Sequence, residues 1–274
     1  MSAGHSRRQE IQALRAVAVL LVVLFHLWPD AVPGGFVGVD VFFAISGFLI
    51  TGLLLRDVEV LGTVSLPAFW ARRARRLLPA PLLVLLLCAA ATVAFVPLTA
   101  WDRFFTEFRA STAYVQNWHL ASASVDYFAA NDAPSPVRHF WSLSAEEQFY
   151  LVWPLLMVVG VLVARRTRGA KRGAITLVLG VATLLSLVCS VVVTGSDPSV
   201  DYYATPTRAW EFGAGGVLAL VARDAVARPV LASDQPKLAT VIAPIASPTD
   251  HRLARGVRLR VATSASAASS GHAT

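Results

Sequence analysis

The sequence predicts an all-α protein, a polytopic bundle of about six transmembrane helices followed by a disordered C-terminal tail. The chain has 274 residues, of which 55% are hydrophobic and only 15% are charged. Soluble domains carry about 25% charged residues. The apolar residues also come in long blocks, and a block of about 20 apolar residues crosses a bilayer core of about 30 Å.

Six apolar blocks define the expected spans. The first is short, because a helix from Ala16 to Trp28 covers only about 20 Å. We therefore expect residues 29–37 to dip into the membrane or line a wet cavity, since lipid-exposed irregular backbone is not tolerated. A signal peptide is the alternative for this block, but no small-residue cleavage site precedes Pro29. The six blocks are 14–28, 39–55, 77–96, 142–164, 174–194 and 207–222.

Two segments lack the spanning pattern. A long polar stretch, 97–139, separates the third and fourth blocks. Residues 223–274 end in a run of Ala, Ser and Thr, a composition that cannot bury enough apolar surface to offset the entropy of ordering. The expected organisation is a transmembrane domain at 10–222 and a disordered tail at 223–274.

The basic residues predict the topology. The net charge is +7, but Lys and Arg gather in short clusters between apolar blocks, which argues against a nucleic-acid partner. The segments up to Arg15, 56–76 and 165–172 hold thirteen Lys and Arg, whereas the intervening segments hold three, Arg103, Arg109 and Arg138. Cytoplasmic loops carry the excess of positive charge. We therefore expect a multi-pass membrane protein with a cytoplasmic N-terminus.

Ionisable side chains within the apolar blocks are the first candidates for chemistry, because they are costly at a helix centre, roughly 2.5–3.5 kcal/mol each. His26 lies at the end of the first block and Asp40 at the start of the antiparallel second block, so both are expected at similar depth. A carboxylate beside an imidazole suits a general base. Asp40 is equally well explained as an acidic residue favoured at a helix N-terminus.

The fourth and sixth blocks begin with further charged residues. Ser144 and Glu147 have the spacing of a capping box, which explains Glu147 but leaves Glu146 as a candidate for the site. Arg208 and Glu211 are one helical turn apart, so they form either an ion pair or a substrate contact.

An arginine cluster precedes the third block. It serves either as a topology anchor or as a phosphate clamp, because guanidinium groups bind phosphate bidentately. The two cysteines, Cys88 and Cys189, lie within apolar blocks and provide no metal-binding spacing. No metal and no permanently bound cofactor is expected. The arginines are Arg72, Arg73, Arg75 and Arg76.

Taken together, these residues resemble membrane acyltransferase family 3, bacterial enzymes that O-acylate surface polysaccharides and lipopolysaccharide. The resemblance runs from Glu10 to about Ala222 and includes an Arg-x10-His spacing, Arg15 to His26. The other matching segments are 38–48 (GVDVFFAISGF), 69–79 (FWARRARRLLP), 140–154 (FWSLSAEEQFYLVWP) and, more weakly, 203–216.

The resemblance implies transfer of an acyl group, an acetyl group above all, from acyl-CoA to a carbohydrate or glycolipid hydroxyl at the bacterial inner (cell) membrane. It implies His26 as the catalytic base, supported by Asp40 and Glu146. Arg15, Arg73 and Arg76 would bind the acyl-CoA co-substrate. Contacts with the acceptor would come from Glu147, Arg208 and Glu211.

The resemblance leaves several alternatives open. Both direct transfer and an acyl-His intermediate are compatible with the residues. Members of the family continue through more helices, so this chain resembles a C-terminally truncated member, and an inactive fragment is one alternative. A proton-coupled transporter that uses His26 and Asp40 as a relay is another; it would show no dependence on acyl-CoA.

Overall fold

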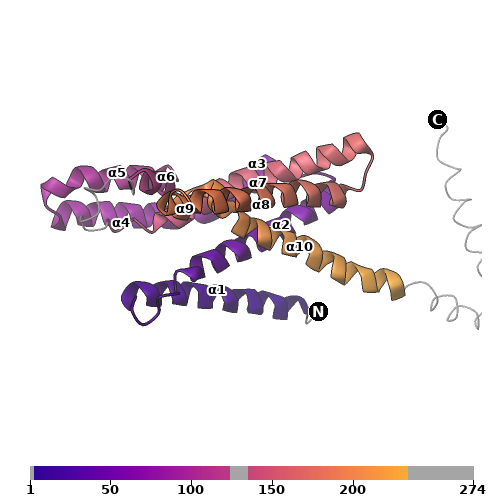
Figure 1. Cartoon of the computed structure of the whole chain (residues 1–274), viewed down its shortest axis with the longest axis horizontal. Coiled ribbons are helices and arrows are strands. Elements are labelled where there is room, and N and C mark those ends of the chain that lie inside the picture. The colour runs from indigo at the N-terminus through magenta and orange to yellow at the C-terminus, as the bar shows by residue number, and fades with distance from the viewer. Residues whose placement is uncertain (1–2, 124–134, 234–274) are drawn as a thin grey trace, which may run out of the picture. The chain divides into compact units, whose positions relative to one another are not determined.

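The computed structural model describes residues 3–123 and 135–233, with side chains described for 9–123 and 135–222. The described residues form helices and turns without a β-strand, which confirms the predicted fold class (Figure 1). The helices are α1 (Ala3–Leu27), α2 (Val37–Leu61), α3 (Leu66–Leu77), α4 (Pro79–Phe95), the 3-10 helix η1 (Leu98–Ala100), α5 (Trp101–Thr112), α6 (Gln116–Ala123), α7 (Phe140–Thr167), α8 (Lys171–Thr194), α9 (Pro198–Tyr203) and α10 (Thr205–Ser233).

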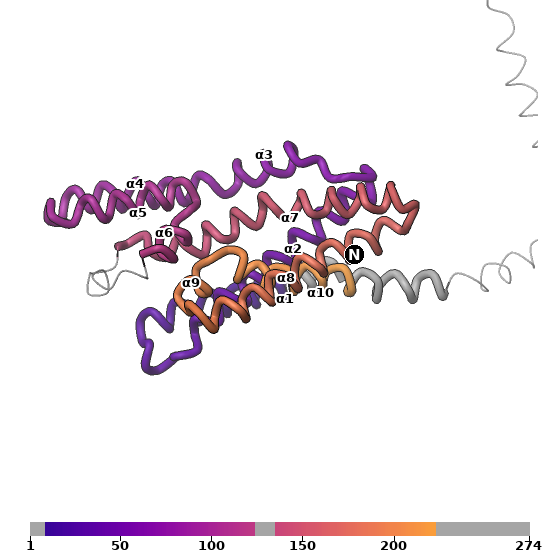
Figure 2. The backbone as a smooth tube through the Cα atoms, turned by 45° about the horizontal axis from the view of Figure 1, so that its top comes forward, coloured from indigo at the N-terminus to yellow at the C-terminus, as the bar shows by residue number. Residues whose placement is uncertain are grey.

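Four of the described helices are long and apolar enough to cross a membrane: α1 from Gln9 onward, α2, α7 and α8. The pair α3 and α4, bent by 41° at Leu78, makes a fifth if it counts as one span (Figure 2). The predicted sixth span lies on α10, which carries Arg208 and Glu211 in its first turns and is not among these helices. The count of about six is therefore approximate.

The first hairpin differs from the expectation in the length of α1. This helix has 25 residues and begins at Ala3, and its apolar part, Gln9–Leu27, has 19 residues, about 28 Å. The expectation of a first helix too short to span is wrong, because helical hydrogen bonding continues upstream through polar residues that the apolar block excludes. Residues 29–36 form the turn from which α1 and α2 diverge (Figure 1).

Small residues allow the helices to approach closely. A Cβ on Gly38 of α2 would lie 2.3 Å from the Ala18 carbonyl oxygen of α1. On the other side of α2, a Cβ on Gly215 of α10 would lie 1.8 Å from the Ala44 carbonyl oxygen. Close backbone approach replaces the hydrophobic driving force that is missing between helices in lipid.

Aromatic rings fill the centre of the bundle. Phe212 of α10 stacks between Phe43 of α2 and Phe149 of α7, with centroid distances of 4.2 and 4.3 Å. Trp153 of α7 donates from its indole nitrogen to Thr51 of α2 at 2.8 Å. These contacts hold α2 and α7 side by side, and the residues in contact are about one hundred positions apart in the sequence.

The polar stretch 97–139 is largely helical where it is described, in α5 and α6. Its buried centre is Glu107, which accepts hydrogen bonds from Gln116 and Ser135 at 2.7 Å each. Asn117 of α6 donates to the Tyr203 carbonyl at 3.1 Å and to the Thr205 hydroxyl at 2.9 Å. The described residues of this stretch therefore pack on the bundle.

The first unit of the chain, which contains the helices of the bundle, ends at Ala222. The helix α10 continues to Ser233, beyond the predicted end of the last span. The rest of the predicted disordered tail, 234–274, lies outside the described residues.

Candidate functional site

A cavity of about 1090 Å³ opens between α1, α2, α3 and α7. Helix α1 presents to it the residues at 12, 15, 18, 19, 22 and 23, and α7 presents those at 142, 143, 146 and 150. Both sets recur every three to four residues, so each is one face of its helix. The sequence-predicted residues that line the cavity are Arg15, Arg73, Arg76 and Glu146.

The cavity wall is strongly basic. Arg15, Arg56, Arg72, Arg73 and Arg76 line it from three different helices. Two guanidinium groups lie over aromatic rings, Arg15 at 4.8 Å from the centroid of Phe42 and Arg73 at 3.9 Å from that of Tyr150. Cation–π contacts of this kind hold an arginine in place while its N–H groups stay available to an anion.

Arg75 shows that α3 sorts its arginines by face. It lies between Arg73 and Arg76 in the sequence, yet it does not line the cavity. Its side chain donates to the Ala71 carbonyl of its own helix at 3.2 Å. Helical periodicity thus directs Arg72, Arg73 and Arg76 toward the cavity and Arg75 away from it.

Glu146 is the buried acidic group of the cavity. Its Oε1 accepts a hydrogen bond from the Ser46 hydroxyl of α2 at 2.6 Å and another from the Tyr150 hydroxyl one turn further along α7. Trp70 of α3 donates to the Tyr150 carbonyl at 3.1 Å. The carboxylate is therefore oriented by two hydroxyl donors, and the arginine that covers Tyr150 places a positive charge nearby.

His26 lies one turn beyond the part of α1 that lines the cavity. Its Nδ1 donates to the Val22 carbonyl at 2.7 Å; because a carbonyl only accepts, the proton is on Nδ1 and the neutral ring keeps Nε2 as its acceptor. The side chain is exposed, and its ring contacts that of His139 with a centroid distance of 4.6 Å. A free Nε2 is what a general base requires.

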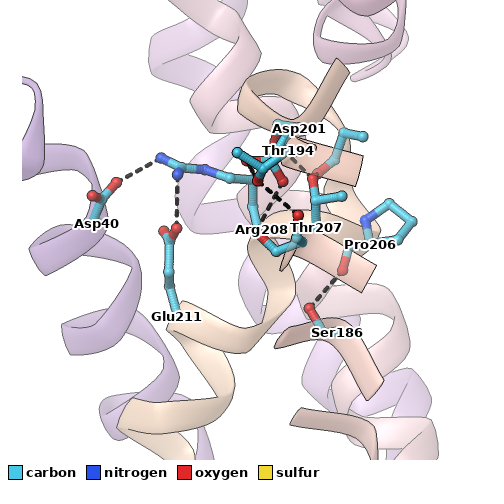
Figure 3. A network of polar contacts seen from close by, with 10 residues as sticks. Asp40, Ser186, Thr194, Asp201, Pro206, Thr207, Arg208 and Glu211 are labelled. Carbon is cyan, nitrogen blue, oxygen red and sulfur yellow. Dashed lines mark hydrogen bonds and ion pairs between the residues drawn. The ribbon is translucent and has the colours of Figure 1, made fainter. Parts of the chain in front are cut away.

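A second charged cluster forms where α2 and α10 begin (Figure 3). Arg208 donates to Asp40 at 2.6 Å and pairs with Glu211 at 2.8 Å. The side chains of Arg208 and Glu211 are 13% and 3% exposed. The ion-pair interpretation of Arg208 and Glu211 is confirmed.

This geometry corrects the expected partner of Asp40. The carboxylate was expected beside His26, but it pairs with Arg208 from a segment 168 residues away in the sequence. Asp40 does lie in the first turn of α2, as the helix N-terminus interpretation predicts. Depth along the membrane placed both residues near the same level, but it did not determine their rotation about the two helix axes.

The family of the chain is shown by a match to a known family model. The family model of an acyltransferase domain, the third acyltransferase family, matches residues 8–230. The chain belongs to this acyltransferase family. The matched residues include every residue that lines the cavity.

Individual acyltransferases are also similar to the chain. The peptidoglycan O-acetyltransferase OatA of Listeria monocytogenes is 38% identical over 212 residues, which are 77% of this chain and 33% of that protein. YrhL of Bacillus subtilis, named as a candidate peptidoglycan O-acetyltransferase, is 38% identical over 216 residues, with the same coverage. The chain spans about a third of the length of these relatives. No solved structure matches the chain.

Within this acyltransferase domain, the capping box predicted at Ser144 is wrong. Helix α7 begins at Phe140, so Ser144 lies inside it and its hydroxyl donates back to the Phe140 carbonyl at 2.9 Å. Helical hydrogen bonding continues upstream of the capping motif because Trp141 and Phe140 pack against the bundle. Glu147 therefore has no capping role, and it does not line the cavity.

Four residues in or next to the candidate site were not predicted from the sequence. Tyr150 is one turn from Glu146, so helical periodicity would have placed both on one face. Arg56 is the first residue of the basic segment 56–76, a signal that was used only for topology. Ser46 carried no signal, because its role depends on α7 being its neighbour. His139 also carried none, because its partner is 113 residues away in the sequence.

Proposed function

We propose that the chain transfers an acetyl group from acetyl-CoA to a hydroxyl group of an envelope carbohydrate, with His26 as the base. Membership of the acyltransferase family supports the reaction class. The observation that supports acetyl-CoA as the acyl donor is the cavity, whose wall holds five arginines from three helices. A multiply charged phosphate donor suits such a wall, because guanidinium groups bind phosphate bidentately.

The dimensions of α1 fit this assignment. Arg15 and His26 are eleven residues apart on one face of the helix, which is about 16 Å along its axis. The CoA phosphates would rest on Arg15, Arg73 and Arg76, and the pantetheine arm would extend along the cavity toward His26. The carbonyl carbon of the thioester would then stand at the end of the hairpin.

The chemistry follows from Nε2 of His26. As the acceptor hydroxyl attacks the thioester carbon, Nε2 takes its proton, the C–O bond forms and the C–S bond breaks. The CoA thiolate leaves and takes up the proton from His26, so the base is regenerated. Glu146 supports the cavity wall, and Asp40, which follows the cavity-lining Val39, supports the site through its pairing with Arg208.

The sidedness of the site is part of the proposal. The excess of Lys and Arg in alternate loops supports a cytoplasmic N-terminus in the bacterial cell membrane. The arginines would then face the cytoplasmic supply of acetyl-CoA, and His26 would face the outer side, where the carbohydrate is. The relatives named for peptidoglycan support an outer acceptor.

The test is transfer of labelled acetyl groups by the purified chain in proteoliposomes, with a soluble peptidoglycan glycan fragment as acceptor. Replacing Arg76 with Ala should raise the KM for acetyl-CoA about tenfold or more, the loss of a charge-assisted hydrogen bond. Arg75→Ala is the matched control, because it removes the same charge from the same helix but leaves the cavity wall intact. His26→Ala should abolish transfer.

Three results would contradict the proposal. If Arg75→Ala and Arg76→Ala changed the KM for acetyl-CoA equally, the arginines would act only as a topology anchor. Full transfer by the His26→Ala variant would show that His26 is not the general base. If the folded chain showed no acetyl-CoA-dependent labelling, the proposed acetyltransferase activity would be wrong.

A further inference from the structure

Two imidazole rings meet next to the α1–α2 turn, one helical turn beyond the residues of α1 and α7 that line the cavity. The rings of His26 and His139 have centroids 4.6 Å apart and planes at 83°, an edge-to-face contact. Both side chains are exposed. Within the described part of the chain, Nδ1 of His26 is the one ring nitrogen of this pair that forms a hydrogen bond. Nε2 of His26 and both nitrogens of His139 are therefore available to a bound molecule.

The two rings continue the two helix faces that form the cavity. His26 follows Val22 by four residues on α1, and His139 precedes Ser142 and Leu143 by three and four residues at the start of α7. Residues three and four apart share a face of a helix. One turn beyond the cavity lining, α1 and the start of α7 thus each present an imidazole, and the two rings are in contact.

We propose that His139 is the second imidazole of an acceptor subsite and hydrogen-bonds an oxygen of the carbohydrate next to the hydroxyl that His26 deprotonates. This inference rests on the proposed function. A saccharide presents neighbouring hydroxyl groups as both donors and acceptors. A neutral imidazole offers one donor and one acceptor, so it matches such a pair of oxygens.

The surroundings of His139 keep its ring in the form that this role needs. Although the residue is exposed, its ring is partly covered, and this desolvation lowers the pKa of His139 from its ordinary value; the nearby His26 and Arg138 lower it further. The ring is therefore neutral at pH 7 and keeps a free acceptor nitrogen. A charged ring would instead offer two donors and would repel the proton that His26 takes up during transfer.

The experiment measures the KM for the glycan fragment and the KM for acetyl-CoA separately in proteoliposomes. His139→Phe keeps the ring contact with His26 and removes both nitrogens. It should raise the KM for the glycan about tenfold, the loss of one hydrogen bond, and change the KM for acetyl-CoA less than about twofold. His139→Gln keeps a donor and an acceptor, so it should recover part of the loss. His119→Phe, a histidine on α6 outside the cavity lining, is the control.

A second measurement does not depend on activity. The glycan fragment should slow the modification of His139 by diethylpyrocarbonate, and acetyl-CoA alone should not. This measurement decides the matter if His139→Phe fails to fold. An unchanged KM for the glycan in folded His139→Phe, or modification that the glycan does not slow, would overturn the inference. An inactive His26→Ala variant together with wild-type behaviour of His139→Phe would overturn this inference and leave the proposed function standing.

Discussion

Replacing Arg208 with Gln should destabilise the folded chain by about 3–5 kcal/mol, the cost of breaking a buried ion pair by removing one partner. Arg208 is the partner of both Asp40 and Glu211. Arg208 contacts the carboxyl groups of both residues, so the substitution leaves two carboxyl groups without a cationic partner in this cluster. The free-energy cost is greatest at Glu211, because only 3% of its side chain is exposed.

The two carboxylates should behave differently when they are replaced instead. Asp40→Asn leaves Arg208 paired with the buried Glu211, and Asp40 itself is 30% exposed, so we expect a loss of no more than about 1 kcal/mol, as for exposed pairs. The double variant Arg208→Gln/Glu211→Gln should be more stable than Arg208→Gln alone, because it removes the buried carboxyl group that the single change leaves without a partner.

Thermal unfolding in detergent micelles is the assay. A loss of 3–5 kcal/mol corresponds to a fall in Tm of about 6–20 °C for a domain of this size. The reasoning is refuted if the double variant is no more stable than Arg208→Gln. A folded Arg208→Gln variant with an unchanged Tm and a raised KM for the acceptor would instead show a substrate contact.

Three further predictions test other parts of the structure. Gly215→Val should prevent folding into a monodisperse species on size-exclusion chromatography, because a Cβ there meets the Ala44 carbonyl oxygen at 1.8 Å; Gly180→Val, with nothing within 4 Å, should not. Glu146→Ala should lower the free energy of unfolding by about 1–3 kcal/mol for each hydroxyl donor left without an acceptor, and Glu146→Gln by much less, as denaturant titration would show. Because the pKa of His139 is lowered in the folded state, protonation favours unfolding, so the Tm should fall as the pH drops below about 6.5, and His139→Gln should reduce that fall.

The local features of this protein follow from its sequence. Blocks of apolar residues predict the spans, and α2, α4, α7 and α8 lie close to the predicted ranges. The pairing of Arg208 with Glu211 was predictable because both residues are on one turn of one helix. The family follows from short motifs whose order along the chain is itself specific. Each of these inferences needs only neighbours in the sequence.

The contacts between helices were decided by the tertiary structure alone. Asp40 meets Arg208, Ser46 meets Glu146 and His26 meets His139, and each pair is 100 or more residues apart. In a soluble helix, the apolar stripe shows which face is inside. A helix in lipid is apolar on nearly all sides, so its pattern does not determine its rotation or its neighbour. Backbone approach at Gly38 and Gly215 and hydrogen bonds between helices determine both, and these depend on the packed bundle.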